Sequence, residues 1–240
     1  MPPPQVDSCT TATTDLVWGM CARLSGTPPA LEYLHRRLPW LDSLEGICEQ
    51  HSLGLSGRTF TINGMQDRLV FPVWSDDGQV AGLRGRTWRQ GDMRLKISSW
   101  YRQEEHLPFG LNLSTQPTIE SLRFTVVVEG EIDCLSLWAS GFPCVASSRT
   151  SLGRYQAERL AELVDCCVIW PDQDTRNPKT GKRPGEEGAK RTCGLLRSLG
   201  VAVKVAEPGC FDNCKDAADC YQQYGPTSIQ QFLELVVGGL

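Results

Sequence analysis

Carboxylate side chains follow two short apolar runs in the second half of the chain. Residues 126–128 lead into Glu129, and residues 167–170 lead, after a proline, into Asp172 and Asp174. Both runs are rich in β-branched and other apolar residues, as short strands are. Residues two apart in extended chain point to the same side, so Asp172 and Asp174 can grip one hard cation with oxygen ligands. Acids held around divalent cations most often serve phosphate chemistry.

Alternating strands and helices surround these acids. The expected helices are residues 131–140, 154–164 and 188–199, and the further strands are residues 144–146 and 201–206. Such a chain folds into a mostly parallel sheet through right-handed crossovers, which bring the carboxyl ends of the strands to one edge. Ligands of open α/β sheets bind at that edge. Asp216, at the next strand-to-helix turn, is therefore expected to join the three acids.

The motifs resemble the TOPRIM domain, the metal-binding α/β module of bacterial-type primases, topoisomerases and some nucleases. The resemblance lies in Glu129-Gly130 followed by Asp133, in the Asp172 and Asp174 pair, and in the Lys215-Asp216 turn, in the family's order. It implies a Rossmann-like, mostly parallel sheet with flanking helices. The alternative is that the acids only cap helices, since a carboxylate in the first turn is favoured there.

The resemblance also implies roles for these residues. Glu129, Asp172 and Asp174 would be catalytic, and together with Asp216 they would hold two or more Mg2+ or Mn2+ ions. Gly130 and Asp133 would support the site, Asp133 by orienting the glutamate or its helix. Asp219 is a weaker ligand candidate, because its spacing from Asp216 departs from the family pattern.

The half before residue 120 separates the TOPRIM families. Residues 67–74 and 79–86 alternate in polarity around Asp77-Gly78, which is a hairpin signal. With residues 96–99 and 107–112, they are similar to the amino-terminal lobe of the DnaG-type primase catalytic core, which has an Arg-x-x-Phe-Pro strand and a Gly-Arg strand. Topoisomerases and small TOPRIM nucleases lack such a lobe. A smaller α+β lobe is thus expected to precede the TOPRIM fold.

Basic and aromatic residues are concentrated in this lobe. The basic residues of the region are Arg84, Arg86, Arg89, Arg94, Lys96 and Arg102, with Trp88, Trp100 and Tyr101 between them and Asp92 as the acid. Such a mixture can bind a phosphate backbone and stack on unpaired bases. The resemblance implies nucleotide or template binding by Arg68, Arg84, Arg86, Lys96 and Lys215. Arg89 and Arg94 fit an ordinary solvated hairpin equally well.

The expected domains are a flexible tail (residues 1–27), the primase-like lobe (28–120), and the TOPRIM domain with carboxy-terminal helices (121–240). The tail is inferred from its prolines and polar residues, which lack the apolar core of a secretory signal. No apolar stretch approaches the roughly 18 to 20 residues that span a bilayer. We therefore expect a cytoplasmic protein with no membrane partner.

Two further features bear on ligands. The chain has eleven cysteines and no Cys-x-x-Cys pair, so no zinc site is expected, Cys210, Cys214 and Cys220 being the nearest to a cluster. Residues 175–187 are rich in Pro, Gly and charge, and are interpreted as an inserted mobile loop. Its Arg176, Lys179, Lys182 and Arg183 either touch triphosphate or template, or are simply solvated.

The expected function is that of a primase catalytic core, which makes short oligoribonucleotide primers on single-stranded DNA from nucleoside triphosphates. The net charge of -4 excludes an indiscriminate nucleic-acid binder. No phosphate-binding helicase motif is present, so a separate helicase or a zinc-binding template-recognition subunit is expected, as in phages and mobile elements. The alternatives are a TOPRIM nuclease, and an accessory subunit of a helicase that binds nucleic acid with little polymerase activity.

Overall fold

The structure is a computed structural model of the 240-residue chain. It describes residues 8–40, 46, 51–58, 64–75, 78–89, 91–92, 96–101, 106–113, 123–176, 178–206, 211 and 213–238. The chain forms two compact units: the first comprises Met1–Arg36 and Asp42–His106, and the second comprises Arg37–Leu41 and Leu107–Leu240. No described helix is both long enough and apolar enough to cross a membrane.

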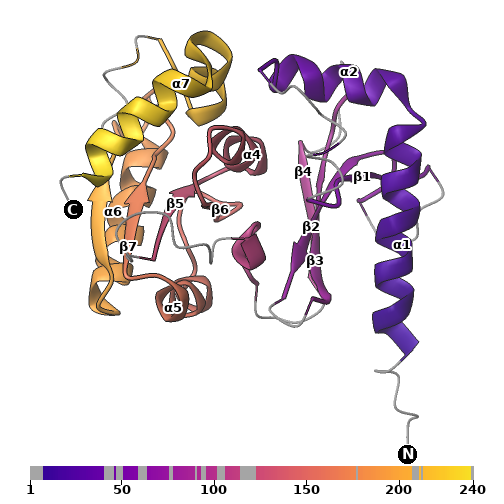
Figure 1. The fold of residues 1–240 in the computed structure, drawn as a ribbon, viewed down its shortest axis with the longest axis horizontal. Coiled ribbons are helices and arrows are strands. Elements are labelled where there is room, and N and C mark those ends of the chain that lie inside the picture. The colour runs from indigo at the N-terminus through magenta and orange to yellow at the C-terminus, as the bar shows by residue number, and fades with distance from the viewer. Residues whose placement is uncertain are drawn as a thin grey trace, which may run out of the picture. The chain divides into compact units, whose positions relative to one another are not determined.

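The first unit is an antiparallel sheet with helices beside it (Figure 1). Its helices are α1 (Ser8–Ser25) and α2 (Pro28–Arg37), and its strands, in sheet order, are β1 (Gly54–Leu55), β2 (Leu69–Trp74), β3 (Val80–Arg86) and β4 (Ile97–Tyr101). The predicted hairpin is the β2–β3 pair. Gly78 has a φ of 75°, a left-handed conformation that glycine adopts without strain. Asp77 lies outside the described residues.

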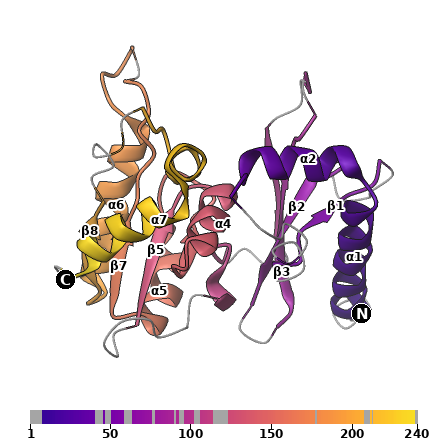
Figure 2. The ribbon, with the colours of Figure 1, turned by 45° about the horizontal axis from the view of Figure 1, so that its top comes forward.

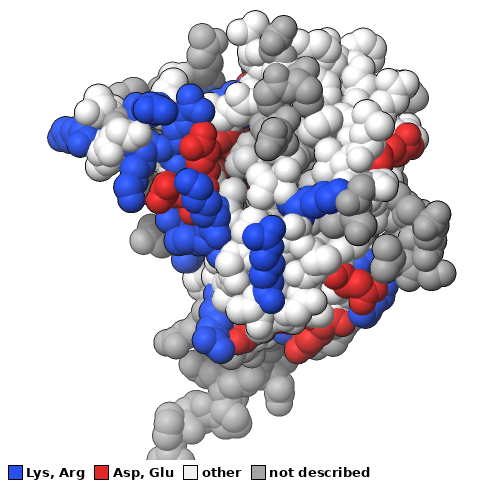
Figure 3. All heavy atoms as spheres, turned by 90° about the vertical axis from the view of Figure 1, so that its left-hand side faces the viewer, with Lys and Arg blue, Asp and Glu red and all other residues white. Residues whose placement is uncertain are grey.

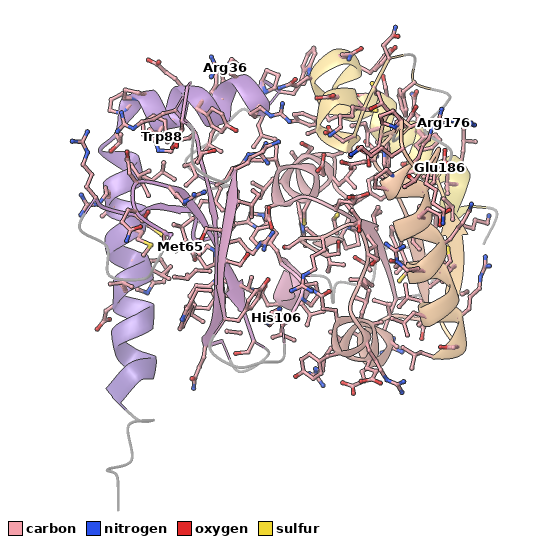
Figure 4. The ribbon with its side chains drawn as sticks, turned by 180° about the vertical axis from the view of Figure 1, so that it is seen from behind. Arg36, Met65, Trp88, His106, Arg176 and Glu186 are labelled. Carbon is pink, nitrogen blue, oxygen red and sulfur yellow. The ribbon has the colours of Figure 1, made fainter. Side chains whose placement is uncertain are left out.

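The expectation of a flexible tail is wrong for residues 8–25, which form α1. Val17, Met20 and Leu24 recur at helical spacing and are buried, so this helix has an apolar side to pack. Val17 and Met20 join Met65, Val70 and Leu83 in one apolar cluster. Met65 lies between α1 and the sheet (Figure 4). Burial of each such side chain contributes about 1.5–3 kcal/mol, which outweighs the polar start of the chain.

The second unit is a parallel sheet with helices on both faces. Its strands are β5 (Phe124–Val128), β6 (Cys144–Ala146), β7 (Cys166–Ile169) and β8 (Ala202–Val205), and its helices are η1 (Leu111–Leu113), α4 (Glu131–Ala139), α5 (Arg154–Leu163), α6 (Pro184–Ser198) and α7 (Ala217–Val237). The fold class expected from the sequence, a mostly parallel sheet with flanking helices preceded by a smaller α+β lobe, is confirmed.

The strand order β6-β5-β7-β8 contains a reversal. The chain steps from β5 to β6 in one direction and then crosses back past β5 to β7. Right-handed crossovers therefore place α4 on one face and α5 and α6 on the other. Figure 2 shows α4 and α6 on opposite sides of β5, and α7 packs on α4. A reversal opens a crevice at the carboxyl ends of the two strands between which it occurs, here β5 and β7.

Two sequence boundaries differ from the structure. The helix expected from residue 188 begins at Pro184, because proline is favoured at the first helical position and acids follow it in the first turn. The predicted division at residue 120 falls instead between His106 and Leu107, with Arg37–Leu41 joining the second unit.

Candidate metal and nucleotide site

The acids predicted from the sequence follow the two strands that flank the crevice. Glu129 comes directly after β5, and Asp172 and Asp174 come after β7. β5 and β7 are paired neighbours, with Val127 opposite Ile169, so these acids leave the sheet side by side. Glu129 Oε1 is buried and accepts no hydrogen bond from the described residues. Such a buried acceptor is costly to leave without a partner.

Burial and mutual repulsion set the protonation of these acids. Burial, with the charges of Asp172 and Asp174, raises the pKa of Glu129 to about 7. Burial and the charge of Asp216, partly offset by Lys215, raise the pKa of Asp172 to about 6. Like charges raise one another's pKa only when they are close. The structure therefore brings Glu129, Asp172, Asp174 and Asp216 together.

Asp174 is tied to the amino terminus of α6. The backbone N–H of Gly185 donates a 3.1 Å hydrogen bond to Asp174 Oδ2, which satisfies one of the free amides of the first helical turn. Only glycine fits at position 185. A Cβ there would lie 2.3 Å from the Asp172 carbonyl oxygen and 3.0 Å from Glu129 Oε1. Gly185 thus lets α6 begin against both acids.

Asp133 supports the site from the first turn of α4. Its Oδ1 accepts a 2.9 Å hydrogen bond from the Ala218 amide at the start of α7. Burial, followed by the charges of Asp216 and Asp172, raises the pKa of Asp133 well above its usual range. A Cβ on Gly130 would lie 2.5 Å from Asp133 Oδ2, so this approach requires glycine. The geometry favours the supporting role predicted for Asp133 and Gly130.

Asp216 combines two of the roles that the sequence left open. It is the N-cap of α7, because its Oδ1 accepts a 2.9 Å hydrogen bond from the Asp219 amide. Its Oδ2 lies 3.9 Å from the Lys215 ammonium. Capping therefore uses one oxygen and leaves the other facing the acids. Asp219 turns toward Arg37, with 3.9 Å between Oδ1 and Nη1, so the geometry favours Asp216 as the ligand candidate.

Lys215 lies among the carboxylates. Its Nζ is 3.6 Å from Asp172 Oδ2, and its side chain is 53% exposed. Burial lowers the pKa of Lys215, but Asp172, Asp216 and Asp174 raise it by more, so the ammonium stays charged. It offsets part of the negative charge and remains accessible to an anionic ligand.

The residues fit a hard divalent cation by their chemistry. All the converging donors are carboxylate oxygens, the ligands that Mg2+ and Mn2+ prefer. The raised pKa values of Glu129 and Asp172 reflect burial and, after it, mutual repulsion, and a cation would relieve the repulsion. Within the part of the chain that the structure describes, however, no three acidic, His or Cys side chains already surround one point at ligand distance. Ion binding would thus require side-chain rotation.

Arg68 does not have the placement expected of a template-binding residue. Its side chain is 2% exposed, and Nη1 donates to the carbonyl oxygens of Gly85 and Lys96 at 3.3 and 3.2 Å. Buried guanidinium groups need such partners. The predicted direct contact of Arg68 with nucleotide or template is not favoured by this burial, and the geometry favours a role in holding β3 against the segment before β4.

The other basic residues of the lobe differ in accessibility. Arg84 is 7% exposed and donates to the hydroxyl of Ser99, so it too faces the interior. Arg86 is half-buried, and its Nε donates to the Tyr33 hydroxyl at 3.1 Å. Lys96 is exposed. Of these, Lys96 has the most accessible side chain for a nucleotide or template.

The aromatic residues of the lobe are mostly packed. Trp88 is 8% exposed, and the Arg89 guanidinium lies 4.4 Å from the centre of its ring. Trp100 packs against the apolar cluster of the first unit. Tyr101 is stacked on His106 with 3.9 Å between ring centres. Stacking of bases on these rings therefore requires rearrangement. Arg94 and Arg102 lie outside the described residues.

The basic insertion is partly helical and partly neutralised. Lys182 lies 3.4 Å from Glu187, and Arg183 lies 2.8 Å from Glu186, in the first turn of α6. Lys and Arg gather with Asp and Glu between them on the face drawn in Figure 3. Arg176 and Glu186 lie at the outer side of the second unit (Figure 4). These contacts favour the solvated alternative for Lys182 and Arg183.

Sequence reasoning missed the glycine and the amide that position the acids. Gly185 and Gly188 both meet neighbouring backbone, and a Cβ on Gly188 would lie 1.7 Å from the Thr150 carbonyl oxygen. The signal was present as small residues three apart just after Pro184. The Ala218 amide carries no sequence signal, because any residue other than proline has one.

Three comparisons place the chain among known proteins. A model of the Toprim-like family matches residues 126–221. The DNA primase of Clostridium acetobutylicum is 27% identical over 176 residues, which cover 72% of this chain and 27% of that protein. This chain thus spans about a quarter of the length of that curated relative.

Solved structures show the same fold. The zinc-binding and RNA polymerase domains of the Aquifex aeolicus primase match with a TM-score of 0.71 and 21% identity, over 91% of this chain and 60% of that one. A DnaG primase catalytic domain bound to single-stranded DNA matches with a TM-score of 0.66 and 17% identity, over 94% and 80% of the two chains. The chain is therefore similar to the Toprim-like family over residues 126–221 and shares the fold of DnaG primase catalytic cores.

Proposed function

We propose that this chain is a DNA primase catalytic core, a nucleotidyltransferase that joins nucleoside triphosphates into short oligoribonucleotides on single-stranded DNA. The observation that carries the proposal is the convergence of acids after the paired strands β5 and β7, where Gly185 lies against Glu129 and Asp172 and its amide holds Asp174. The lobe that carries the exposed Lys96 precedes this site in the chain, and the chain shares its fold with DnaG primase catalytic cores.

In the proposed reaction, the oxygen of a 3'-hydroxyl forms a bond to the α-phosphorus of the incoming triphosphate. The bond from that phosphorus to the β-phosphate oxygen breaks, pyrophosphate leaves, and the hydroxyl proton passes to solvent. Two or more Mg2+ or Mn2+ ions, held by Glu129, Asp172, Asp174 and Asp216, would stabilise the charge of the triphosphate and lower the pKa of the hydroxyl.

The protein's own residues would prepare this step. Lys215, 3.6 Å from Asp172, is placed to pair with a phosphate oxygen once the acids hold cations. The Gly185 amide holds Asp174, and the Ala218 amide holds Asp133, so two of the acids are already fixed by the protein before a cation binds. Lys96, exposed in the first unit, is the leading candidate for a contact with the triphosphate or template.

The nuclease alternative would use the same acids to activate water, and the accessory alternative would need none of them. Incubation with labelled nucleoside triphosphates, Mg2+ or Mn2+ and a single-stranded DNA distinguishes the three. Growing labelled oligonucleotides support the proposal. A shortened template supports a nuclease, and an unchanged bound template supports an accessory subunit.

Matched variants tie the activity to the site. Asp172→Asn removes a proposed metal ligand. Asp165→Asn removes an exposed acid that pairs with Arg123 at the amino end of β7, away from the proposed ligands. The proposal expects a loss of primer synthesis of at least about a hundredfold in the first variant and little change in the second. A helicase or a zinc-binding template-recognition subunit is the proposed partner, and addition of such a partner should raise the rate of initiation.

A further inference from the structure

A cavity of about 390 Å³ lies within the first unit, away from the acids. It is formed where four segments meet: the end of α1, the residues after β1, the turn before β2, and the segment after β3. Arg23, Arg58 and Arg89 line it, and Asp67 is the acid among its lining residues. Its volume lies within the range of small-molecule sites, about 300–1,000 Å³.

The three arginines are not equivalent. Arg89 is held by Asp67, with Nε 2.8 Å from Oδ2 and Nη2 3.3 Å from Oδ1, and it lies on the ring of Trp88. This two-pronged pair fixes the position of the guanidinium and uses the charge of Asp67. Arg89 therefore forms a wall of the cavity and already has a counter-charge.

Arg23 and Arg58 are left without a counter-charge. Both side chains are exposed, and neither has an ion pair or hydrogen bond with a carboxylate among the described residues. Arg23 lies over Gly57, since a Cβ on that glycine would be 3.4 Å from its guanidinium carbon. Three positive charges thus share one cavity with one acid, and the net charge of its lining is positive.

We propose that this cavity binds phosphate groups, as a second anion site separate from the carboxylate cluster. Guanidinium groups match phosphate oxygens through paired hydrogen bonds, and an anion would relieve the repulsion between Arg23 and Arg58. The ligand class is a phosphate-bearing molecule up to the size of a nucleotide. The phosphate comes either from a free nucleoside polyphosphate or from the backbone of a nucleic acid.

This site differs from the surface predicted from the sequence. The predicted contacts within this lobe were Arg68, Arg84, Arg86 and Lys96, on or beside β2, β3 and β4, and two of those arginines face the interior. The cavity takes its arginines from the segments that flank these strands. None of the proposed metal ligands lines this cavity, so the proposed phosphate binding does not depend on primer synthesis.

The test measures binding of sodium pyrophosphate by calorimetry in EDTA, so that no divalent cation can attract the anion to the acids. The double variant Arg23→Gln with Arg58→Gln removes the two unpaired guanidinium groups. Arg36→Gln, in α2 of the same unit and outside the cavity lining, is the matched control. The proposal expects at least tenfold weaker binding in the double variant and less than a twofold change in the control.

Further arms distinguish the sources of phosphate. The first further probe is a single-stranded oligothymidine without terminal phosphates. If the double variant binds it more weakly than the wild type does, and if pyrophosphate displaces it, the ligand is a nucleic-acid backbone. The second further probe is ATP. If the substitutions weaken ATP binding as much as pyrophosphate binding, and leave oligonucleotide binding unchanged, the ligand is a free nucleotide. Arg58→Lys keeps the positive charge but loses the paired N–H donors of the guanidinium group. Its affinity for pyrophosphate is therefore expected to lie between those of the wild type and the double variant. Equal affinities of the wild type and the double variant for all three probes, with both proteins folded by thermal melting, would overturn the proposal.

Discussion

The Ala218 amide donates a 2.9 Å hydrogen bond to Asp133 Oδ1, which joins the first turn of α7 to the first turn of α4. Asp133→Ala leaves this buried amide without a partner, which costs about 1–3 kcal/mol. Asp133→Asn retains an acceptor oxygen, and it resembles the neutral form of the carboxyl, which burial and the charges of Asp216 and Asp172 favour by raising the pKa of Asp133. Thermal melts at pH 7 should show the alanine variant several degrees lower and the asparagine variant close to the wild type. Equal destabilisation by both would contradict this assignment.

Glu129→Gln should stabilise the metal-free protein at pH 8. The folded pKa of Glu129, about 7, lies above its usual value of 4.5, so its contribution to stability is present below pH 4.5 and is lost as the pH rises through 7. The neutral amide avoids this loss. We expect a gain of about 1 kcal/mol in unfolding free energy at pH 8 and none at pH 4, measured in urea with EDTA.

The control for that experiment is Glu158→Gln on α5, where the native glutamate pairs at the surface with Arg154. Loss of such a surface pair changes stability by about 0–1 kcal/mol. Two results would contradict the prediction: a gain in unfolding free energy from Glu129→Gln that persists at pH 4, or a loss of unfolding free energy at pH 8. Either would show that the ionised carboxylate of Glu129 does not destabilise the protein.

Mg2+ binding should weaken as the pH falls. The carboxylates of Glu129 and Asp172 must lose their protons before they bind a cation, and their pKa values are about 7 and about 6. Proton competition at these two groups predicts an affinity about tenfold lower at pH 6 than at pH 7.5. Calorimetric titration with MgCl2 at both pH values measures the change. An affinity independent of pH would exclude these acids as the ligands.

Gly185→Ala should disrupt the site without removing a polar group. Its Cβ would meet the Asp172 carbonyl oxygen at 2.3 Å, so α6 or the Asp172 segment must move. Gly194→Ala is the control in the same helix, because a Cβ there meets nothing within 4 Å. The control should gain up to about 1 kcal/mol of stability from helix propensity. The Gly185 variant should lose stability and Mg2+ affinity together, as seen in melts with and without Mg2+.

The sequence predicts the second unit well because its signals are local. Apolar runs ending in Glu129 and Asp172 specify strands and the edge at which their acids meet, and right-handed crossovers supply the rest. The start of α6 was missed, although Pro184 and the acids after it are a helix signal, because the charged residues before it resemble a loop.

The first unit is harder to predict because burial is not local. Nothing near Arg68 shows that its guanidinium lies inside, bonded to carbonyl oxygens of Gly85 and Lys96. Strand alternation places a residue on a face, but which faces are covered depends on distant segments such as α1. In α1, the spacing of Val17, Met20 and Leu24 was a usable signal that the polar chain start obscured.

The most direct test of the account is the position of Mn2+ in crystals of the protein, determined from its anomalous scattering. The account predicts a peak within about 2.0–2.4 Å of carboxylate oxygens of Glu129 and Asp172 or Asp174, at the crevice between β5 and β7. Ordered crystals at high Mn2+ concentration that show no peak there, or peaks only elsewhere, would contradict it.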